Sequence, residues 1–247
     1  MSDLFKRPTG PAAHVERALC IVAHPDDLDF GSAGTVATWT AAGTDVTYCI
    51  LTDGDAGGFD ADVAREEIGP LRRAEQRAAA GVVGVSDVRF LGYRDGQLEL
   101  TLDLRRDIAR VIRQVRPQRV LTSSPERNWE WIDNSHPDHM VTGEATLRAV
   151  YPDARNPFAF PELLAEEGLD AWTVDEVWVY GTPRADHTVD VTDQLDLKLA
   201  ALNSHVSQVA HIDQLESSVT EWMQLTAQRF DLPAGQLVEA FHIVHTG

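Results

Sequence analysis

Short apolar runs alternate along the chain with longer stretches of helical character, and this alternation constrains the fold more than any other feature. Four short, mostly apolar segments are predicted to be strands and occupy residues 18–23, 46–51, 88–91 and 120–122. Four stretches of helical character follow them, at residues 31–42, 69–83, 102–115 and 137–150. Strands that alternate with helices usually pair in parallel and are covered on both faces. The sequence therefore predicts an α/β protein with a mostly parallel sheet and helices on both faces.

The last third of the chain shows the same alternation less regularly. Predicted strands occupy residues 176–180 and 238–244, and predicted helices occupy residues 195–202 and 214–228. Residues 151–168 contain three prolines and are interpreted as an inserted flap at the edge of the functional site. No convincing linker divides the chain, so we predict one domain that spans residues 1–247.

The charge of the chain narrows the classes of partner. Asp and Glu number 39 against 21 Lys and Arg, which gives a formal net charge of -18. This charge repels phosphate backbones and anionic lipid surfaces, so we expect neither a nucleic acid nor a membrane as a partner. No apolar run near the start is long enough for a membrane span or a secretory signal, and we expect a cytoplasmic protein.

A His-Pro-Asp tripeptide occurs twice, each time in a loop that follows a predicted strand. The first lies in residues 24–27, His-Pro-Asp-Asp, and the second in residues 136–139, His-Pro-Asp-His. Ligands of an open α/β sheet bind beyond the carboxyl ends of the strands, so two such loops can meet at one site. The alternative is that each motif is only a turn, in which aspartate caps a helix and proline occupies its first turn.

The residue types in the two motifs are those that bind zinc. Imidazole nitrogens and carboxylate oxygens suit this ion, and a catalytic zinc ion has three protein ligands and one open position. His24 and Asp27 are three residues apart and can both reach one ion, while His139 can supply the third ligand from the second motif. These three residues therefore form a predicted zinc site.

The remaining motif residues can supply the acid–base chemistry of amide hydrolysis. Asp26 is adjacent to the predicted ligands, so we expect it to act as the general base toward water. His136 is the candidate for oxyanion stabiliser or acid, and Asp138 is expected to orient the His136 ring. Helix capping is the alternative role of Asp138. From the residues alone, the prediction is a metal-dependent amide hydrolase.

Further motifs accompany these two and extend over most of the chain. They are Leu-Thr-Asp-Gly-Asp at 51–55, Arg72 with Glu75, Leu-Gly-Tyr-Arg-Asp-Gly at 91–96, Lys198 with His-Val-Ser-Gln at 205–208, and Glu-Ala-Phe at 239–241. In this combination the chain resembles the PIG-L/LmbE-like deacetylases. That family includes enzymes that act on N-acetylglucosaminyl phosphatidylinositol, mycothiol precursors and bacillithiol precursors.

The resemblance implies a single-domain Rossmann-like fold and a zinc-dependent activity. It implies zinc on His24, Asp27 and His139, Asp26 as the general base, and assistance to the oxyanion by His136. It also implies the substrate, an N-acetylglucosamine-type amino sugar or its glycoside, from which acetate is removed. Assemblies of several subunits occur in such a family, so a homo-oligomer is compatible with the resemblance.

Three more positions resemble substrate-binding positions of the family, namely Asp55, Arg72 and Asp95. Asp55 stands where many relatives have Glu. Arg72 has an alternative as the partner of Glu75 on an exposed helix face, and Asp95 has an alternative as a residue that only shapes a turn. Trp129 and Trp131 flank the second motif and suit either stacking on a sugar or ordinary packing. His205 either approaches the site or is structural.

Three other functions compete with this interpretation. A zinc amidohydrolase could act on another amide, such as a thiol-sugar conjugate or a natural-product N-acyl sugar, because catalytic machinery does not define the acyl acceptor. A nucleotide-binding protein would carry a Gly-x-Gly-x-x-Gly turn after the first strand, which this sequence lacks. A metal-stabilised interaction module would have a closed cluster of four Cys and His residues, which the sequence also lacks.

Overall fold

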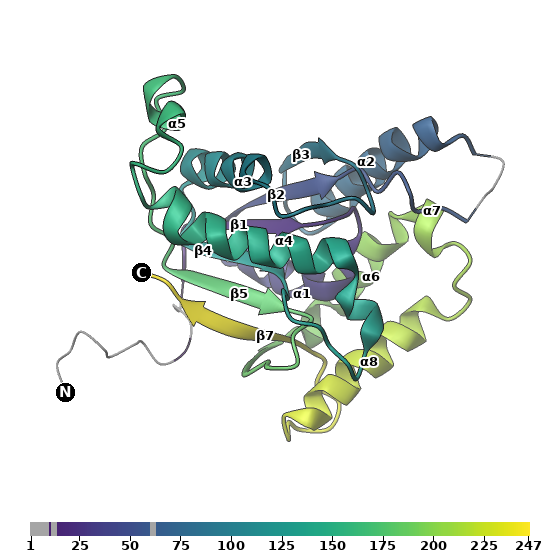
Figure 1. The fold of residues 1–247 in the computed structure, drawn as a ribbon. Coiled ribbons are helices and arrows are strands. Elements are labelled where there is room, and N and C mark those ends of the chain that lie inside the picture. Colours follow the sequence, from purple (N-terminus) through teal and green to yellow (C-terminus); the bar gives the residue numbers. More distant parts are fainter. Residues whose placement is uncertain (1–9, 11–13, 60–62) are drawn as a thin grey trace, which may run out of the picture.

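Seven strands form one sheet in the part of the chain that the computed structural model describes, which is residue 10, residues 14–59 and residues 63–247 (Figure 1). Their order is β3-β2-β1-β4-β5-β7-β6. β1 to β5 are parallel, whereas β7 is antiparallel to both β5 and β6. The strands are β1 (Arg17–Val22), β2 (Asp45–Thr52), β3 (Asp87–Tyr93), β4 (Arg119–Ser123), β5 (Glu176–Tyr180), β6 (His187–Asp190) and β7 (Val238–His245). The predicted domain of residues 1–247 includes residues 1–9, 11–13 and 60–62, which lie outside the described residues.

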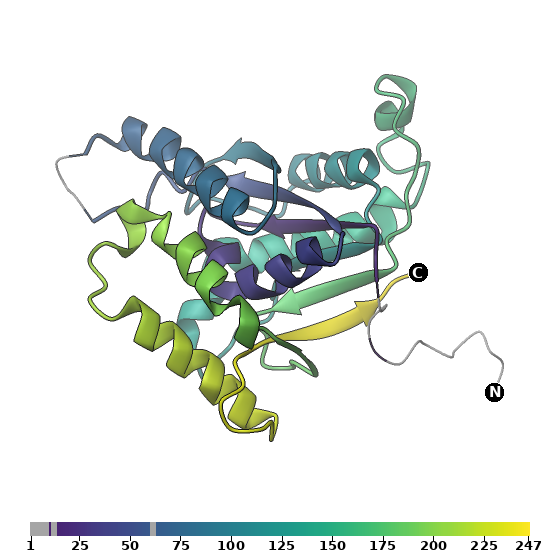
Figure 2. The same cartoon turned by 180° about the vertical axis from the view of Figure 1, so that it is seen from behind.

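Helices cover both faces of this sheet. α3 and α4 lie on the face seen in Figure 1, and α1, α2 and α6 lie on the face seen in Figure 2. The prediction of a mostly parallel α/β fold with helices on both faces is therefore confirmed. The helices are α1 (Asp27–Ala41), α2 (Arg65–Val82), α3 (Leu102–Val115), η2 (Ile132–Ser135), α4 (Pro137–Arg148), η3 (Ala149–Ala154), α5 (Pro161–Ala165), η4 (Thr192–Gln194), α6 (Leu195–Asn203), α7 (Val206–Val209) and α8 (Leu215–Arg229).

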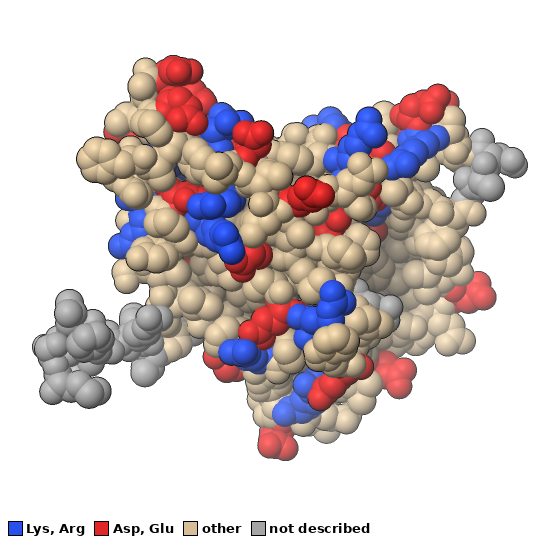
Figure 3. Space-filling view, viewed as in Figure 1, with Lys and Arg blue, Asp and Glu red and all other residues tan. Residues whose placement is uncertain are grey.

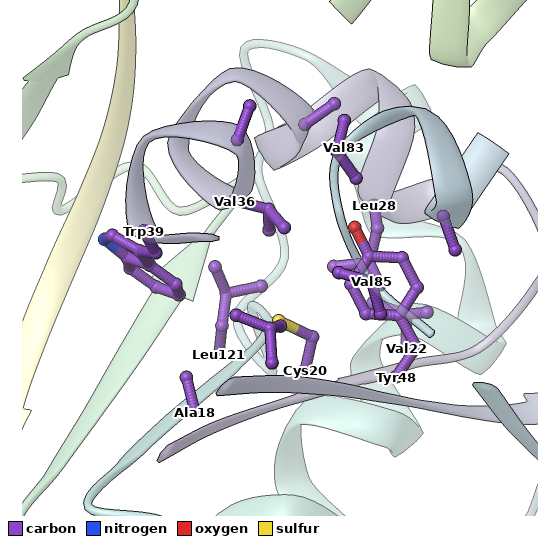
Figure 4. Close-up of a cluster of buried hydrophobic side chains, with 14 of the residues drawn as sticks. Ala18, Cys20, Val22, Leu28, Val36, Trp39, Tyr48, Val83, Val85 and Leu121 are labelled. Atoms are coloured by element: carbon purple, nitrogen blue, oxygen red, sulfur yellow. The ribbon is translucent and has the colours of Figure 1, made fainter. Parts of the chain in front are cut away.

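The central strands are mostly apolar, because both of their faces are buried. In β1, Ala18, Cys20 and Val22 belong to the cluster under α1, while Leu19 and Ile21 belong to the cluster under α3 and α4. Successive side chains of a strand point to opposite faces, so one continuous apolar run supplies both layers. Full burial of a large aliphatic side chain is worth about 1.5–3 kcal/mol. Figure 4 shows the first layer, where β1 faces the α1 side chains Leu28, Val36 and Trp39.

The strand order places the two His-Pro-Asp motifs next to each other. The chain runs from β1 outward to β3 and then returns to β4, on the other side of β1. Connections that leave neighbouring strands in opposite directions open a crevice at the carboxyl edge of the sheet, where ligands bind. The first motif follows β1 and the second follows β4, so both lie at this crevice.

Some element boundaries differ from the predictions. The predicted ranges 102–115 and 176–180 are confirmed, but α1 begins at Asp27, four residues before the predicted start at residue 31. α2 begins at Arg65, four residues before the predicted start at residue 69, and Pro70 lies inside the helix. β6 and α7 have four residues each and were not predicted, because so short a segment carries no readable periodicity.

The expectation that residues 151–168 form a flap at the edge of the site is wrong. The buried guanidinium of Arg113, near the end of α3, donates to carbonyl oxygens in this segment, those of Asp153, Asn156 and Ala159. α5 accordingly lies beyond the amino ends of the parallel strands, at the opposite end of the sheet from the two motifs (Figure 1). The three prolines correctly indicated that residues 151–168 have an irregular backbone. They did not indicate which part of the protein this segment packs against.

Charged side chains of both signs are interspersed on the face shown in Figure 3, where blue and red groups lie close together. Several of them form exposed ion pairs, such as Arg148 with Glu144 on α4. Within the described ranges, the search for a membrane span finds no helix with the necessary length and apolar character.

Candidate active site

Three ligand-type side chains meet where the loops after β1 and β4 come together. His24 Nδ1 lies 3.2 Å from His139 Nε2, although the two residues are 115 positions apart in the sequence. Asp27 Oδ1 is 2.9 Å from His139 Nε2, and Asp27 Oδ2 is 3.5 Å from His24 Nδ1. Ligand atoms of a tetrahedral zinc ion are about 3.3 Å apart, as bond lengths of about 2.0–2.1 Å require. The three side chains therefore have the separations that one shared ion needs.

The two motifs position these ligands through the helices that they start. Asp27 is the first residue of α1, and His139 is the third residue of α4, which begins at Pro137. Proline suits the start of a helix because its missing N–H would be unpaired there in any case. A helix N-terminus also favours a carboxylate such as that of Asp27. Each motif thus fixes a ligand on a rigid first helical turn.

The second ring nitrogen of His24 is held by carboxylates. His24 Nε2 lies 3.0 Å from Asp95 Oδ1 and 3.3 Å from Asp138 Oδ2. Asp138 is itself fixed, because it accepts the backbone N–H groups of Gly96 (2.7 Å) and Leu98 (3.3 Å). A metal-binding histidine commonly donates its other N–H to a carboxylate, which fixes the ring and makes it a better ligand. The donor set and its supports therefore fit a metal ion on His24 Nδ1.

The electrostatics of the site also favour a cation. Burial lowers the pKa of His24, but the charge of Asp27 and hydrogen bonds to Asp138, Asp27 and Asp95 outweigh burial and raise that pKa to about 12. Burial raises the pKa of Asp27, but His139 and His24 hold it well below its usual range. The carboxylates thus stabilise positive charge at this position, whether a proton or a metal ion carries it.

Asp26 lies beside the ligands in an unusual backbone conformation. Its φ of 85° is in the left-handed region, which a residue other than glycine adopts rarely and mainly at functional sites. Its N–H donates to Gln76 Oε1 at 2.8 Å, and its Oδ2 accepts from Arg72 Nη2 at 2.9 Å. Burial raises the pKa of Asp26 to about 6, although the charge of Arg72 opposes the increase. A carboxyl group with this pKa can accept a proton near neutral pH.

His136 borders the same site, and its tautomer follows from one contact. His24, His136 and His139 have ring nitrogens within 4.8 Å of one another. The backbone N–H of Asp138 donates to His136 Nδ1 at 3.2 Å, from which we infer that the neutral ring carries its proton on Nε2. Burial and the positive charges of His24 and His139 lower the pKa of His136. At neutral pH the ring therefore presents one hydrogen-bond donor, Nε2–H.

The contacts of Asp138 differ from our expectation. Its carboxylate lies against His24, whereas we expected it to orient His136. It is the backbone of Asp138 that contacts the His136 ring. The alternative role, capping of α4 by Asp138, is also wrong, because the residue at the N-cap position is His136. The carboxylate of Asp138 is held on the side of His24 by the N–H groups of Gly96 and Leu98.

Arg72 is buried against Asp26 and is not an exposed surface residue. Its guanidinium donates to Asp26 Oδ2 and to two backbone carbonyl oxygens, one of them that of Gly54 at 2.9 Å. The alternative of an exposed pair with Glu75 is wrong, because Glu75 is buried and accepts from Ser207. A Cβ on Gly54 would lie 2.3 Å from Arg72 Nη1, so glycine is needed at this position for the arginine to fit.

Asp55 and Asp95 lie beside each other at the edge of the site. Asp55 Oδ1 accepts the N–H of Asp95 at 3.2 Å, and Asp55 Oδ2 pairs with Arg65 at 3.1 Å. The carboxylate of Asp95 contacts His24 and accepts the N–H of Ala56 at 3.0 Å. Substrate binding by Asp55, Arg72 and Asp95 stays a prediction.

A buried polar network under Asp26 was not predicted from the sequence. Gln76 Nε2 donates to Asp29 Oδ2 at 2.8 Å, and the same oxygen is 2.8 Å from His205 Nε2. Asp29 and His205 are fully buried, so His205 supports the loop of Asp26 from below. The available signal was Asp29 itself, a charged residue between the apolar Leu28 and Phe30.

A cavity of about 520 Å³ opens from Asp27 and His139. It is lined by the loops after β4 and β5 and by the end of α8. Trp131 is part of this lining, and its ring packs edge-to-face on Trp222 with centroids 5.7 Å apart. Trp129 is 82% exposed and is not part of the lining. Of the two tryptophans considered for sugar stacking, Trp131 is therefore the one that faces the cavity.

Comparison with known proteins gives a consistent picture. Residues 19–150 match the family model PIG-L, described as GlcNAc-PI de-N-acetylase. The chain is 35% identical over 208 residues to the diacetylchitobiose deacetylase of Thermococcus kodakarensis, with 84% of this chain and 76% of that protein covered. It is 31% identical over 220 residues to the probable N-acetyl-alpha-D-glucosaminyl L-malate deacetylase 2 of Bacillus cereus, with 84% and 94% covered. The N,N'-diacetylchitobiose deacetylase from Pyrococcus horikoshii, solved with an inhibitor, matches the structure with a TM-score of 0.85 at 28% identity, covering 94% of this chain and 84% of that chain.

Proposed function

This chain belongs to the PIG-L family of GlcNAc-PI de-N-acetylases, and we propose that it is a zinc-dependent hydrolase that removes acetate from the N-acetyl group of an N-acetylglucosamine-type sugar or its glycoside. The relatives from Thermococcus kodakarensis and Bacillus cereus are both named as deacetylases of such sugars. Membership of the family confirms the resemblance predicted from the motifs. It also favours amide hydrolysis over nucleotide binding and over a purely structural metal site.

The observation that carries the proposal is the meeting of His24, Asp27 and His139 at the end of a cavity of about 520 Å³. A structural zinc site is closed by four protein ligands, whereas a catalytic site has three and keeps one position for a reactant. Two imidazole nitrogens and one carboxylate form a set that suits zinc, so we propose zinc as the ion. When bound, the ion polarises the amide carbonyl and favours the ionisation of water.

The side chains around the proposed ligands act as the general base and as the hydrogen-bond donor to the oxyanion. Asp26, held by Arg72 and Gln76, accepts a proton from the attacking water as the new C–O bond forms. His136 donates Nε2–H to the oxygen that becomes negatively charged. The C–N bond then breaks, and the proton on Asp26 passes to the leaving nitrogen. The products are acetate and the free amino sugar, and Asp26 regains its starting state.

The charge of the chain bears on which partners it binds. We propose a small-molecule amino sugar as the partner, and neither a nucleic acid nor a membrane. The net charge of -18 supports the absence of anionic partners. We also propose a cytoplasmic location and assembly into a homo-oligomer.

Acetate release from zinc-loaded protein tests the proposed function directly. The substrates are N-acetylglucosamine, N,N'-diacetylchitobiose and N-acetylglucosaminyl L-malate, and we expect acetate from at least one of them. Asp26→Asn should retain zinc but lose about 10²–10⁴-fold in kcat, the range of general-base contributions. His139→Ala should lose zinc as well. Asp103→Asn, at an exposed site on α3, is the matched control and should retain full activity. Undiminished turnover by Asp26→Asn would remove Asp26 from the base role.

A further inference from the structure

The cavity beside the candidate active site extends far beyond the metal ligands. Asp27 and His139 line one part of it, and another wall consists of residues 180–183 and 185, at and after the end of β5, and residues 222, 226, 229 and 230 at the end of α8. We call this wall and the space before it the outer pocket. The wall lies outside residues 19–150, the part of the chain that matches the family model. The β5 and α8 side of the outer pocket is therefore formed by a region that the family model does not match.

The α8 wall follows from the spacing of residues along the helix. Val219, Met223 and Ala227 are buried, and the first two belong to a cluster with Val191, Leu202 and Leu237, against which Trp222 is also partly packed. Trp222 and Thr226, one position before this stripe at each turn, face the outer pocket. Residues four apart lie on the same side of a helix, so α8 has one stripe that anchors it and a neighbouring stripe that lines the pocket. The anchoring stripe holds Trp222 in place.

The lining combines aromatic rings with neutral hydrogen-bonding groups. Trp222 is joined to the opposite loop by its edge-to-face contact with Trp131, with an interplanar angle of 71°. The other aromatic side chains of the lining are Phe30, Tyr180 and Phe230, and the neutral polar ones are Ser123, Ser124, Asn128, Asn134, Thr182 and Thr226. A pyranose ring offers C–H groups on its faces and hydroxyl groups on its edge, and this mixture of groups matches it.

Charge in the lining argues against an anionic group in the outer pocket. Among the described lining residues, the charged side chain outside the metal-ligand end is that of Arg229, which is exposed at the end of α8. Recognition of a carboxylate or phosphate normally uses buried cations or paired hydrogen bonds from a fixed guanidinium. A cation on the last turn of a helix also has an independent role, since it interacts favourably with the helix dipole.

Resting on the proposed function, we propose that the outer pocket binds a second, uncharged pyranose attached to the N-acetylated sugar, and that Trp222 stacks on this ring. The enzyme then prefers an N-acetylated disaccharide over the monosaccharide and over a glycoside with an acidic aglycone. Trp222 is a specificity-determining residue in this arrangement, because the reacting amide lies beside Asp27 and His139.

Kinetics of the zinc-loaded full chain on three substrates test this proposal. For the wild type, we expect kcat/KM for N,N'-diacetylchitobiose to exceed that for N-acetylglucosamine and for N-acetylglucosaminyl L-malate by about tenfold, the upper range for one aromatic contact. Trp222→Ala should remove most of this preference through an increase in KM for the disaccharide, while kinetics on the monosaccharide stay unchanged. Trp222→Phe should restore part of the preference, because it keeps an aromatic face.

Two control variants separate stacking from general effects. Leu225→Ala changes an exposed residue on the same helix, and Trp129→Ala removes an exposed tryptophan from the loop after β4; both should keep the wild-type preference. Equal kcat/KM for disaccharide and monosaccharide in the wild type would overturn the proposal, even if Trp222→Ala fails to fold. A preference for the malate glycoside would overturn it as well. Absence of acetate release from all three substrates would instead refute the proposed function, and the proposal about the outer pocket with it.

Discussion

Lys198 and Glu239 form a fully buried ion pair that ties α6 and β7 to the start of α1. Lys198 Nζ lies 2.7 Å from Glu239 Oε1 and also donates to the carbonyl oxygens of Asp29 at 3.0 Å and Phe30 at 2.7 Å. Glu239 in turn accepts two backbone N–H groups within α1, at 3.1 and 2.7 Å. The pair therefore positions the helix that begins with Asp27, a proposed metal ligand.

Lys198→Met keeps the length of the side chain and removes its charge. Glu239 then remains in the interior with its backbone donors but without a cation. Removal of one partner of a buried pair typically lowers the free energy of unfolding by about 3–5 kcal/mol. In a protein of this size, about 1 kcal/mol corresponds to a Tm change of about 2–4 °C. We therefore expect Lys198→Met to lower Tm by about 6–20 °C.

Urea unfolding at fixed protein and zinc concentrations measures this effect, with Glu239→Gln and the double variant completing the cycle. The double variant should lose less than the sum of the single variants, by at least about 1 kcal/mol, because it no longer leaves a charge unpaired. Arg148→Met, which breaks the exposed pair with Glu144, should lose no more than about 0.5 kcal/mol. A loss below about 1 kcal/mol for Lys198→Met, or strict additivity in the cycle, would refute the reasoning.

Four further predictions concern the site itself. The proposed base must be unprotonated, so kcat/KM of the zinc-loaded enzyme should fall as the pH is lowered, with a midpoint at or below about 6, because burial raises the pKa of Asp26 to about 6 and a bound cation stabilises its carboxylate. Arg72→Gln removes the neighbouring positive charge and should move this acid limb upward by about 1–3 pH units, whereas an unchanged pH profile would show that Arg72 does not act on Asp26. His136→Ala should lower kcat by about 10²–10³-fold with zinc content unchanged, and loss of zinc would make it a ligand instead. Removal of zinc by a chelator should abolish acetate release while circular dichroism reports an intact fold; unfolding on chelation would indicate a structural ion.

Much of the catalytic core could be predicted because its residues are neighbours in the sequence. His24 and Asp27 lie in one motif and His136 and His139 in the other, and the apolar runs before them identify the strands. Once those strands are parallel and adjacent, the two loops must meet at the same edge of the sheet. The position of His205 could not be predicted in this way, because a single histidine has no periodic pattern that reports its partner.

Contacts between distant segments explain the expectations that failed. The proline-rich segment 151–168 docks on α3 through Arg113, at the far end of the sheet from the site. The carboxylate of Asp138 contacts His24, and it is the backbone N–H of Asp138 that donates to His136. Neither contact has a sequence signature, because each depends on side-chain directions that are fixed only when two elements pack together.

The sequence alone therefore determined the α/β class, the edge of the sheet where the two motifs meet and the choice of His24, Asp27 and His139 as candidate metal ligands. These properties are local: they depend on apolar periodicity and on short motifs at the ends of strands. Three features were decided only by the tertiary structure. Arg72 contacts Asp26, and Asp95 and Asp138 contact His24. Trp222 of α8 lines the cavity. Such contacts join residues tens to hundreds of positions apart, and close packing of the interior selects them only after the whole chain has folded.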